Sequence, residues 1–246
     1  MLSAGKTDKG IVRRDNQDFF LIDHIPDRQT ALYVVCDGMG GASAGNIASK
    51  LAAEAFIEAL RDTPFDTLES ADIFAKLENA TGAANATVYK HAKEHAECRG
   101  MGTTLVGAVL VRNKAYIINV GDSRAYRISD GQILQVTRDH SLVEDMVFRG
   151  DITRDEALHH PNRNLITRAL GTDTQVAWDV FDTTVMESDR LLLCSDGLTN
   201  LVSDGEILEE VTGTKDPEKC AELLIHLALS RGGSDNITVV LAGVSE

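Results

Sequence analysis

Seven short apolar runs, each closed by turn-forming residues, are the strongest constraint on the fold of this 246-residue chain. Runs of this length that are rich in Val, Ile and Leu are typical of buried β-strands. Asp130-Gly131 lies between two of them as a strong hairpin signal, and Asn113-Lys114 is a weaker one. Strands joined by such short turns pair antiparallel, because a parallel crossover needs about a dozen residues or more. The expected strands are Leu32–Cys36, Thr104–Val111, Ala115–Val120, Ala125–Ile128, Ile133–Val136, Arg190–Cys194 and Ile237–Val244.

Apolar residues recur at helical spacing in three further segments, which predicts amphipathic helices. These segments are Ala48–Leu60, Ile73–His95 and Pro217–Ser230. Two capping boxes, Thr153 with Glu156 and Ser203 with Glu206, mark the starts of short helices. The sequence therefore predicts a strand-rich α+β protein with helices that can cover its sheets.

Composition bounds the class of protein. Hydrophobic residues make up 43% and charged residues 25% of the chain, which is ordinary for a globular protein. With only 4 prolines and no linker-like stretch, we expect one domain over residues 1–246. The 38 acids outnumber the 24 bases and give a net charge of −14, so nucleic acid and anionic membrane surfaces are not the expected partners.

The compartment is predicted from the apolar runs and the cysteines. No run approaches the ~18 residues of a transmembrane helix, and the first residues contain no signal-peptide core. Cys36, Cys98, Cys194 and Cys220 are widely spaced and form no CxxC pair. Such single cysteines are typical of buried thiols in a reducing compartment, so we expect a cytoplasmic protein.

Four aspartates lie where expected strands begin or end. Asp37, Asp122 and Asp196 follow strands, and Asp235 directly precedes one. An Asp at a strand end is most often only a turn residue, and that alternative stands for each position taken singly. As a set, four carboxylates held at strand ends would repel each other unless they bind a cation, and hard ions such as Mg²⁺ and Mn²⁺ prefer oxygen ligands.

The residues around these aspartates form a series of motifs. In chain order they are Arg13-Arg14-Asp15-Asn16-Gln17-Asp18, Val35-Cys36-Asp37-Gly38-Met39-Gly40-Gly41, Met101-Gly102-Thr103-Thr104, Val120-Gly121-Asp122-Ser123-Arg124, Thr137-Arg138-Asp139-His140-Ser141, Leu165-Ile166-Thr167-Arg168-Ala169-Leu170-Gly171, Leu193-Cys194-Ser195-Asp196-Gly197-Leu198 and Ser234-Asp235-Asn236-Ile237-Thr238. Their order along the whole chain resembles the compact bacterial members of the type 2C, or PPM, family of metal-dependent serine/threonine protein phosphatases.

The resemblance implies a fold. Family members are four-layer α-β-β-α sandwiches, in which two central antiparallel sheets are flanked by helices. In bacterial relatives the segment corresponding to residues 142–164 is a mobile flap subdomain beside the active site. We expect this flap to contact the substrate polypeptide, and the alternative is a plain surface insertion.

The resemblance also implies a metal site, built mainly from the aspartates. Asp37 would bridge two metals, Mn²⁺ or Mg²⁺, and Gly38 would contribute its carbonyl oxygen. Asp196 and Asp235 would complete the first metal site, and Asp122 with Asp196 would hold a third, weaker metal.

Two residues of the first motif complete the implied site. Asp18 would support the second metal, and Arg13 would bind the substrate phosphate.

The implied reaction is hydrolysis of phosphoserine and phosphothreonine in proteins. A water or hydroxide that bridges the two metals attacks phosphorus, and no covalent intermediate forms. The chain has Met39 and Ala42 where some relatives have a histidine that protonates the leaving group, so this acid is unassigned. Gln17 stands where many relatives have glutamate, which places more weight on Asp18 at the second metal.

Two other functions are compatible with the sequence. A switch phosphatase dedicated to one regulatory phosphoprotein is one alternative, and a phosphatase-like binding module without catalysis is another. We expect a monomer whose partners are phosphoproteins and a cognate serine/threonine kinase. His91 and His95 have the spacing of a metal pair, but no third ligand is evident and we interpret them as solvent-facing; His140 is expected to be structural.

Overall fold

The computed structural model describes residues 2–25, 29–41 and 44–244, and Ala42 lies outside them. Two antiparallel sheets form the centre of the molecule. The first has the order β1-β11-β10-β7-β8, and the second has the order β2-β3-β5-β6-β9 with β4 paired to β3. The strands of the first sheet are β1 (Leu2–Asp8), β7 (Arg124–Ser129), β8 (Gln132–Gln135), β10 (Arg190–Cys194) and β11 (Ile237–Gly243). Those of the second are β2 (Asp18–Ile25), β3 (Thr30–Met39), β4 (Gly102–Thr103), β5 (Leu105–Val111), β6 (Lys114–Val120) and β9 (Asp179–Thr184).

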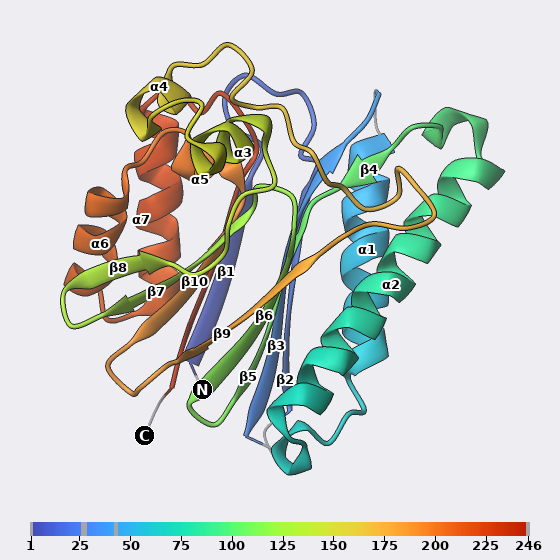
Figure 1. The fold of residues 1–246 in the computed structure, drawn as a ribbon. Coiled ribbons are helices and arrows are strands. Elements are labelled where there is room, and N and C mark those ends of the chain that lie inside the picture. Colours follow the sequence, from blue (N-terminus) through green and yellow to red (C-terminus); the bar gives the residue numbers. More distant parts are fainter. Residues whose placement is uncertain (1, 26–28, 42–43, 245–246) are drawn as a thin grey trace.

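Helices cover both outer faces of the sheet pair, which confirms the expected four-layer α+β sandwich (Figure 1). The covering helices are α1 (Ala44–Leu60) and α2 (Ser70–Glu94) on the second sheet, and α6 (Asp204–Gly213) and α7 (Pro217–Ser230) on the first. Two short 3-10 turns, Phe65–Thr67 and Ala96–Cys98, flank α2. The helices α3 (Leu142–Arg149), α4 (Arg154–Leu158) and α5 (Asp196–Thr199) lie together at one end of the sandwich (Figure 1).

Three apolar clusters hold the layers together. One lies between the second sheet and α1 and α2, and another lies between the first sheet and α6 and α7. The third fills the space between the sheets and includes Tyr33, Val106 and Leu193, which are fully buried. Because side chains alternate along a strand, β3 supplies Leu32 and Val34 to the helix side while Tyr33 faces the other sheet.

The hairpin expected at Asp130-Gly131 is confirmed, since both residues have the positive φ angles, 51° and 70°, of a type I′ turn. The weaker hairpin signal at Asn113-Lys114 is wrong by one residue. Lys114 pairs with Val111, and the turn is made by Arg112, with φ 55°, and Asn113.

The expected helices and all seven expected strands are present, and α7 begins and ends at the predicted residues. Both capping boxes form at the starts of α4 and α6. All four cysteines are buried and free of disulfides. Four strands were not predicted, β1, β2, β4 and β9; β1, β4 and β9 contain no apolar run of three or more residues, whereas β2 contains Phe19–Ile22. No helix of the described segments is long and apolar enough to span a bilayer.

Candidate active site

A cavity of about 260 Å³ opens at one end of the two packed sheets. Six of the seven expected site residues line it. Its lining includes Arg13, Asp37, Gly38, Asp122, Asp196 and Asp235. Asp37 lies in β3 and Asp122 follows β6, so both come from the second sheet. Asp196 begins α5 directly after β10, and Asp235 precedes β11, so these two come from the first sheet. The cavity therefore depends on the packing of one sheet against the other.

Asp37 is fixed by the two threonines of the Gly102-Thr103-Thr104 motif. The Asp37 backbone N–H donates to Thr104 Oγ1 at 2.9 Å, and the Thr104 N–H donates to the Asp37 carbonyl at 2.9 Å. Thr103 Oγ1 also donates to that carbonyl. Thr104 Oγ1 lies 2.7 Å from Ser123 Oγ, which ties β3 to the turn that carries Asp122. These hydroxyls explain why polar residues stand in a fully buried stretch.

Gly38 has no room for a side chain. A Cβ atom there would overlap the Gly45 carbonyl of α1 and would approach the Gln17 carbonyl. The Gly38 N–H donates to that Gln17 carbonyl at 3.0 Å. Glycine is required because the backbone of β3 runs against both the first turn of α1 and the loop before β2.

Asp18 lies behind the cavity and is 5% exposed. The register of β2 on β3 places it directly opposite Asp37. Its Oδ2 accepts hydrogen bonds from Ser195 Oγ and Thr238 Oγ1, both at 2.7 Å, but its Oδ1 is buried without a hydrogen-bond partner. An unpartnered carboxylate oxygen in the interior is costly, so Asp18 fits a site that supplies a positive charge or a bridging water.

The loop before β2 carries Arg13 to the cavity. The Asn236 side chain holds this loop, since it donates to the carbonyls of Lys9 and Asp15 and accepts from the Gln17 N–H at 2.8 Å. Arg13 Nη2 donates to Asp235 Oδ2 at 2.7 Å, and half of the Arg13 side chain remains exposed. A guanidinium at the cavity mouth has the geometry to bind a phosphate with two hydrogen bonds.

The clustered acids raise one another's pKa values. Burial and the charge of Asp196 raise the pKa of Asp122 to about 8, and burial and Asp235 raise the pKa of Asp196. Burial, followed by the charges of Asp18 and Asp196, raises the pKa of Asp37 well above its usual range. Such a set of carboxylates is stabilised by divalent cations, which favour the charged forms.

The donor atoms of the cavity suit a divalent cation, but their spacing is wider than that of a closed ligand set. All the donors are oxygens, and Asp196 Oδ1 is a second buried carboxylate oxygen without a partner. Within the residues that the structure describes, however, no three acidic, His or Cys side chains lie close enough together to form a closed ligand set. Two of the acids are held by other partners, because Asp235 Oδ2 accepts from Arg13 and Asp196 Oδ2 accepts from Asn200 Nδ2 at 2.9 Å.

A second cavity of about 340 Å³ lies beside the first and shares Asp122 and Asp196 with it. Its other wall is the segment expected as a flap, which contributes Arg154, His159 and Arg163. Within this segment, Glu144 of α3 is buried and accepts hydrogen bonds from the Arg154 guanidinium of α4. The flap segment therefore forms part of the surface next to the candidate active site.

Sequence reasoning missed the residues that hold the acids in place. Ser195, Thr238, Ser123, Asn200 and Asn236 make the hydrogen bonds described above, and four of them lie inside or next to the recognised motifs. Ser123, Ser195 and Asn236 could have been found as small polar residues adjacent to a strand-end aspartate, whereas Thr238 and Asn200 lie three and four positions from the nearest one. Met39, which stands where some relatives have a histidine, lines the cavity. His91 of α2 and His95, which directly follows α2, are each half-buried, and the centres of their stacked rings lie 4.0 Å apart.

Comparison with known proteins decides the family. The family described as "Protein phosphatase 2C" matches residues 10–224. The chain belongs to this family. This 2C phosphatase is accordingly a metal-dependent serine/threonine protein phosphatase that acts on phosphoproteins.

Individual relatives agree with this assignment. The serine/threonine phosphatase stp of Listeria innocua is 38% identical over 236 residues, which cover 96% of the 2C phosphatase and 93% of the relative. The crystal structure of the serine/threonine phosphatase Stp1 from Staphylococcus aureus superimposes with a TM-score of 0.91 and 38% identity, over 100% of this chain and 96% of that one. The catalytic domain of PstP, solved in complex with 2 manganese ions, gives a TM-score of 0.83 at 35% identity over 99% and 98% of the two chains.

Proposed function

We propose that the cavity holds two divalent cations, Mn²⁺ or Mg²⁺, through Asp37, Asp196, Asp235 and the Gly38 carbonyl, with Asp18 supporting the second. The observation that carries this proposal is the convergence of carboxylates from both sheets on one cavity, next to two buried carboxylate oxygens without partners. The relative solved with 2 manganese ions supports the count. We also assign Asp122, with Asp196, to a third and weaker cation.

When bound, two divalent cations neutralise phosphoryl oxygens and lower the pKa of water so that it can attack phosphorus at neutral pH. Arg13 binds and orients the phosphate at the mouth of the cavity. Among the described residues that line the cavity there is no Cys, His or Ser, and Thr104 is already hydrogen-bonded to Ser123. The cavity therefore offers no thiol, imidazole or unpartnered hydroxyl as a nucleophile, and we propose that water attacks directly without a covalent intermediate. The acid that protonates the leaving group is not assigned.

The proposal is tested by hydrolysis of a phosphothreonine peptide with Mn²⁺, with and without a chelator. We expect the chelator to abolish activity and Asp37→Asn to remove most of it. Calorimetric titration with Mn²⁺ should show loss of the tightest binding in the same variant. Activity that survives the chelator, or full activity of Asp37→Asn, would reject the two-cation site.

The flap segment, residues 142–164, is proposed to contact the substrate polypeptide. Phe148 and Leu158 are 72% and 67% exposed, so this segment presents apolar side chains to solvent, and Leu158 also lines the second cavity. A variant lacking part of the segment should lose activity on a phosphoprotein and keep it on a small aryl phosphate. Equal loss on both substrates would reject a role in substrate recognition.

The remaining organisation is proposed from the fold and the family. One catalytic domain spans residues 1–246, because the site draws on strands from both sheets and from both halves of the chain. We propose that this domain acts as a monomer in the cytoplasm and opposes a cognate serine/threonine kinase. Sedimentation of the purified protein tests the first point, and dephosphorylation of a co-encoded kinase tests the last.

A further inference from the structure

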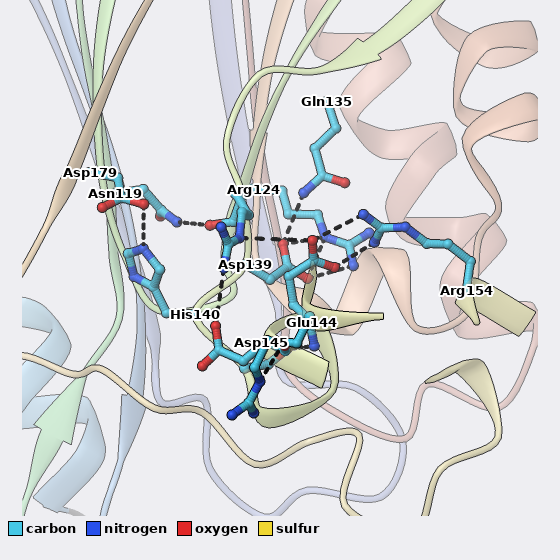
Figure 2. Close-up of polar contacts among 12 residues, drawn as sticks. Asn119, Arg124, Gln135, Asp139, His140, Glu144, Asp145, Arg154 and Asp179 are labelled. Carbon is cyan, nitrogen blue, oxygen red and sulfur yellow. Dashed lines mark hydrogen bonds and ion pairs between the residues drawn. The ribbon is translucent and has the colours of Figure 1, made fainter. Parts of the chain in front are cut away.

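The turn after β6 brings Asp122 to the border of both cavities, and its backbone is fixed on both sides of that residue. Gly121 has φ +105°, and a side chain there would collide with Thr104. On the far side, Ser123 Oγ lies 2.7 Å from Thr104 Oγ1. Arg124 then donates to both carboxylate oxygens of Asp139, at distances from 2.7 to 3.1 Å (Figure 2). No side chain of the described residues donates a hydrogen bond to the Asp122 carboxylate, so the position of this carboxylate depends on the backbone of the turn.

His140 fixes the near side of the turn by a reciprocal pair of hydrogen bonds. The Gly121 N–H donates to His140 Nδ1 at 3.1 Å, and the His140 N–H donates to the Gly121 carbonyl at 2.9 Å. The Asn119 side chain donates to the same carbonyl at 3.1 Å. His140 is 3% exposed, so water does not replace these contacts.

The hydrogen bonds determine the tautomer of this histidine. A backbone N–H can only donate, so Nδ1 accepts and the proton resides on Nε2. Nε2 lies 3.2 Å from Asp179 Oδ2, its acceptor (Figure 2). Arg168 Nη1 lies 3.0 Å from both Asp179 Oδ1 and His140 Nε2. Because a neutral ring whose Nδ1 accepts must carry its proton on Nε2, Arg168 donates to Asp179 and not to the ring. Burial lowers the pKa of His140 and the charge of Arg168 adds to this effect, which agrees with a neutral ring.

We propose that His140 is a positioning residue for Asp122. Its neutral ring accepts the Gly121 N–H through Nδ1 and is held by Asp179 through Nε2–H, so that the Asp122 carboxylate points to the border between the two cavities. This inference rests on the proposed function, because it assigns to His140 the orientation of a carboxylate that we expect to bind the weaker cation. Histidines and carboxylates that orient a ligand in this way commonly change metal affinity ~10–100-fold when they are replaced.

Two matched substitutions separate the acceptor at Nδ1 from the rest of the ring. In His140→Asn the amide oxygen lies one bond beyond Cγ, as Nδ1 does, and can accept the Gly121 N–H. In His140→Gln the amide reaches toward Asp179 and leaves Gly121 without an acceptor. Both replacements are neutral and polar, so a difference between them reports on the Gly121 contact.

The first readout is amide hydrogen exchange at Gly121 in metal-free protein. We expect wild type and His140→Asn to protect this amide, and His140→Gln to exchange it faster while amides in the sheet centres are unchanged. The second readout is Mn²⁺ titration followed by calorimetry, in which His140→Gln should weaken the lowest-affinity Mn²⁺ by ~10-fold or more and leave the tighter binding unchanged. Asp122→Asn should remove that lowest-affinity binding altogether.

The results distinguish the role of His140 from the proposed cation site at Asp122. If Asp122→Asn loses the weak Mn²⁺ and His140→Gln keeps it, the role of His140 is refuted and the cation site stands. If Asp122→Asn keeps all Mn²⁺ binding, the cation role of Asp122 is refuted and the role of His140 falls with it. Equal losses in His140→Asn and His140→Gln would show that the ring, rather than its acceptor, matters, and would overturn the inference. If His140→Gln does not fold, His140→Asn decides alone, with normal Gly121 protection and Mn²⁺ binding as the supporting result.

Discussion

Asp18→Asn should stabilise the metal-free protein at neutral pH, although Asp18 is one of the best-buried acids of the site. Its carboxylate is 5% exposed, and one oxygen has no partner. Burial raises the pKa of Asp18 from 3.8 to about 7, against the opposing effect of the Ser195 and Thr238 hydroxyls. An asparagine carbonyl can accept from the same two hydroxyls and carries no charge.

The magnitude follows from the two pKa values. A carboxyl group whose pKa is higher in the folded than in the unfolded protein makes its full contribution to stability at a pH below the unfolded-state pKa. This contribution to stability is lost as the pH rises from the unfolded-state pKa through the folded-state pKa. For a carboxyl that moves from 3.8 to about 7, the loss is about 4 kcal/mol at pH 7 and about 2 kcal/mol at pH 5. Any destabilisation caused by the buried amide of Asn is independent of pH. The increase in the free energy of unfolding from Asp18→Asn should therefore be about 2 kcal/mol larger at pH 7 than at pH 5.

The assay is urea unfolding in the presence of a chelator at both pH values. Asp189→Asn is the matched control, because hydrogen bonds from the Met186 N–H and Arg127 outweigh burial and lower the pKa of Asp189. This control should lose stability by a similar amount at pH 5 and pH 7. A gain for Asp18→Asn that does not change with pH, or a loss at pH 7 alone, would refute the reasoning.

Three further predictions concern binding, backbone and flap. Arg13→Ala should raise KM for an aryl phosphate about tenfold or more, because the guanidinium that binds the phosphate is lost. Arg14 does not line the cavity, so Arg14→Ala should leave KM unchanged. Equal effects of the two substitutions would contradict the assignment of Arg13 to phosphate binding. Gly38→Ala should destabilise by about 2 kcal/mol or more because Cβ meets backbone, whereas Gly82→Ala in open space on α2 should stabilise by up to about 1 kcal/mol in thermal unfolding. Glu144→Gln should speed amide exchange in α3 and α4 with little change in global unfolding, because it weakens the ion pair to Arg154 within the flap segment and the one to Arg138 just before it. Unchanged exchange would contradict this prediction.

The sequence predicted the elements whose apolar pattern is strong. β5 and β6 are buried on both faces and stand out as continuous apolar runs, and α7 has a Pro in its first turn and a regular apolar face. β1 was missed because its seven residues are mostly small or polar, and Gly5 lies against the Phe20 ring. β9 is an edge strand with only one side in the core, so its pattern is weak.

The candidate site was predictable as a set of acids but not as a geometry. Strand ends at Asp37, Asp122, Asp196 and Asp235 indicated convergence, and all four do line one cavity. The contacts that orient them, such as Ser195 to Asp18, join residues 177 positions apart. Such pairs arise only when the two sheets pack, and nothing in the local sequence indicates which hydroxyl meets which carboxylate.

The pairing of β11 with β1 has a consequence for the newly made protein. β11 lies between β1 and β10, yet a ribosome delivers it about 230 residues after β1. At about 5–20 residues per second, a nascent chain spends roughly 10 to 50 s with β1 lacking this neighbour and with Asp235 missing from the cavity. The time needed for translation therefore delays completion of the active site. The protein can dephosphorylate its substrates only after β11 has been made.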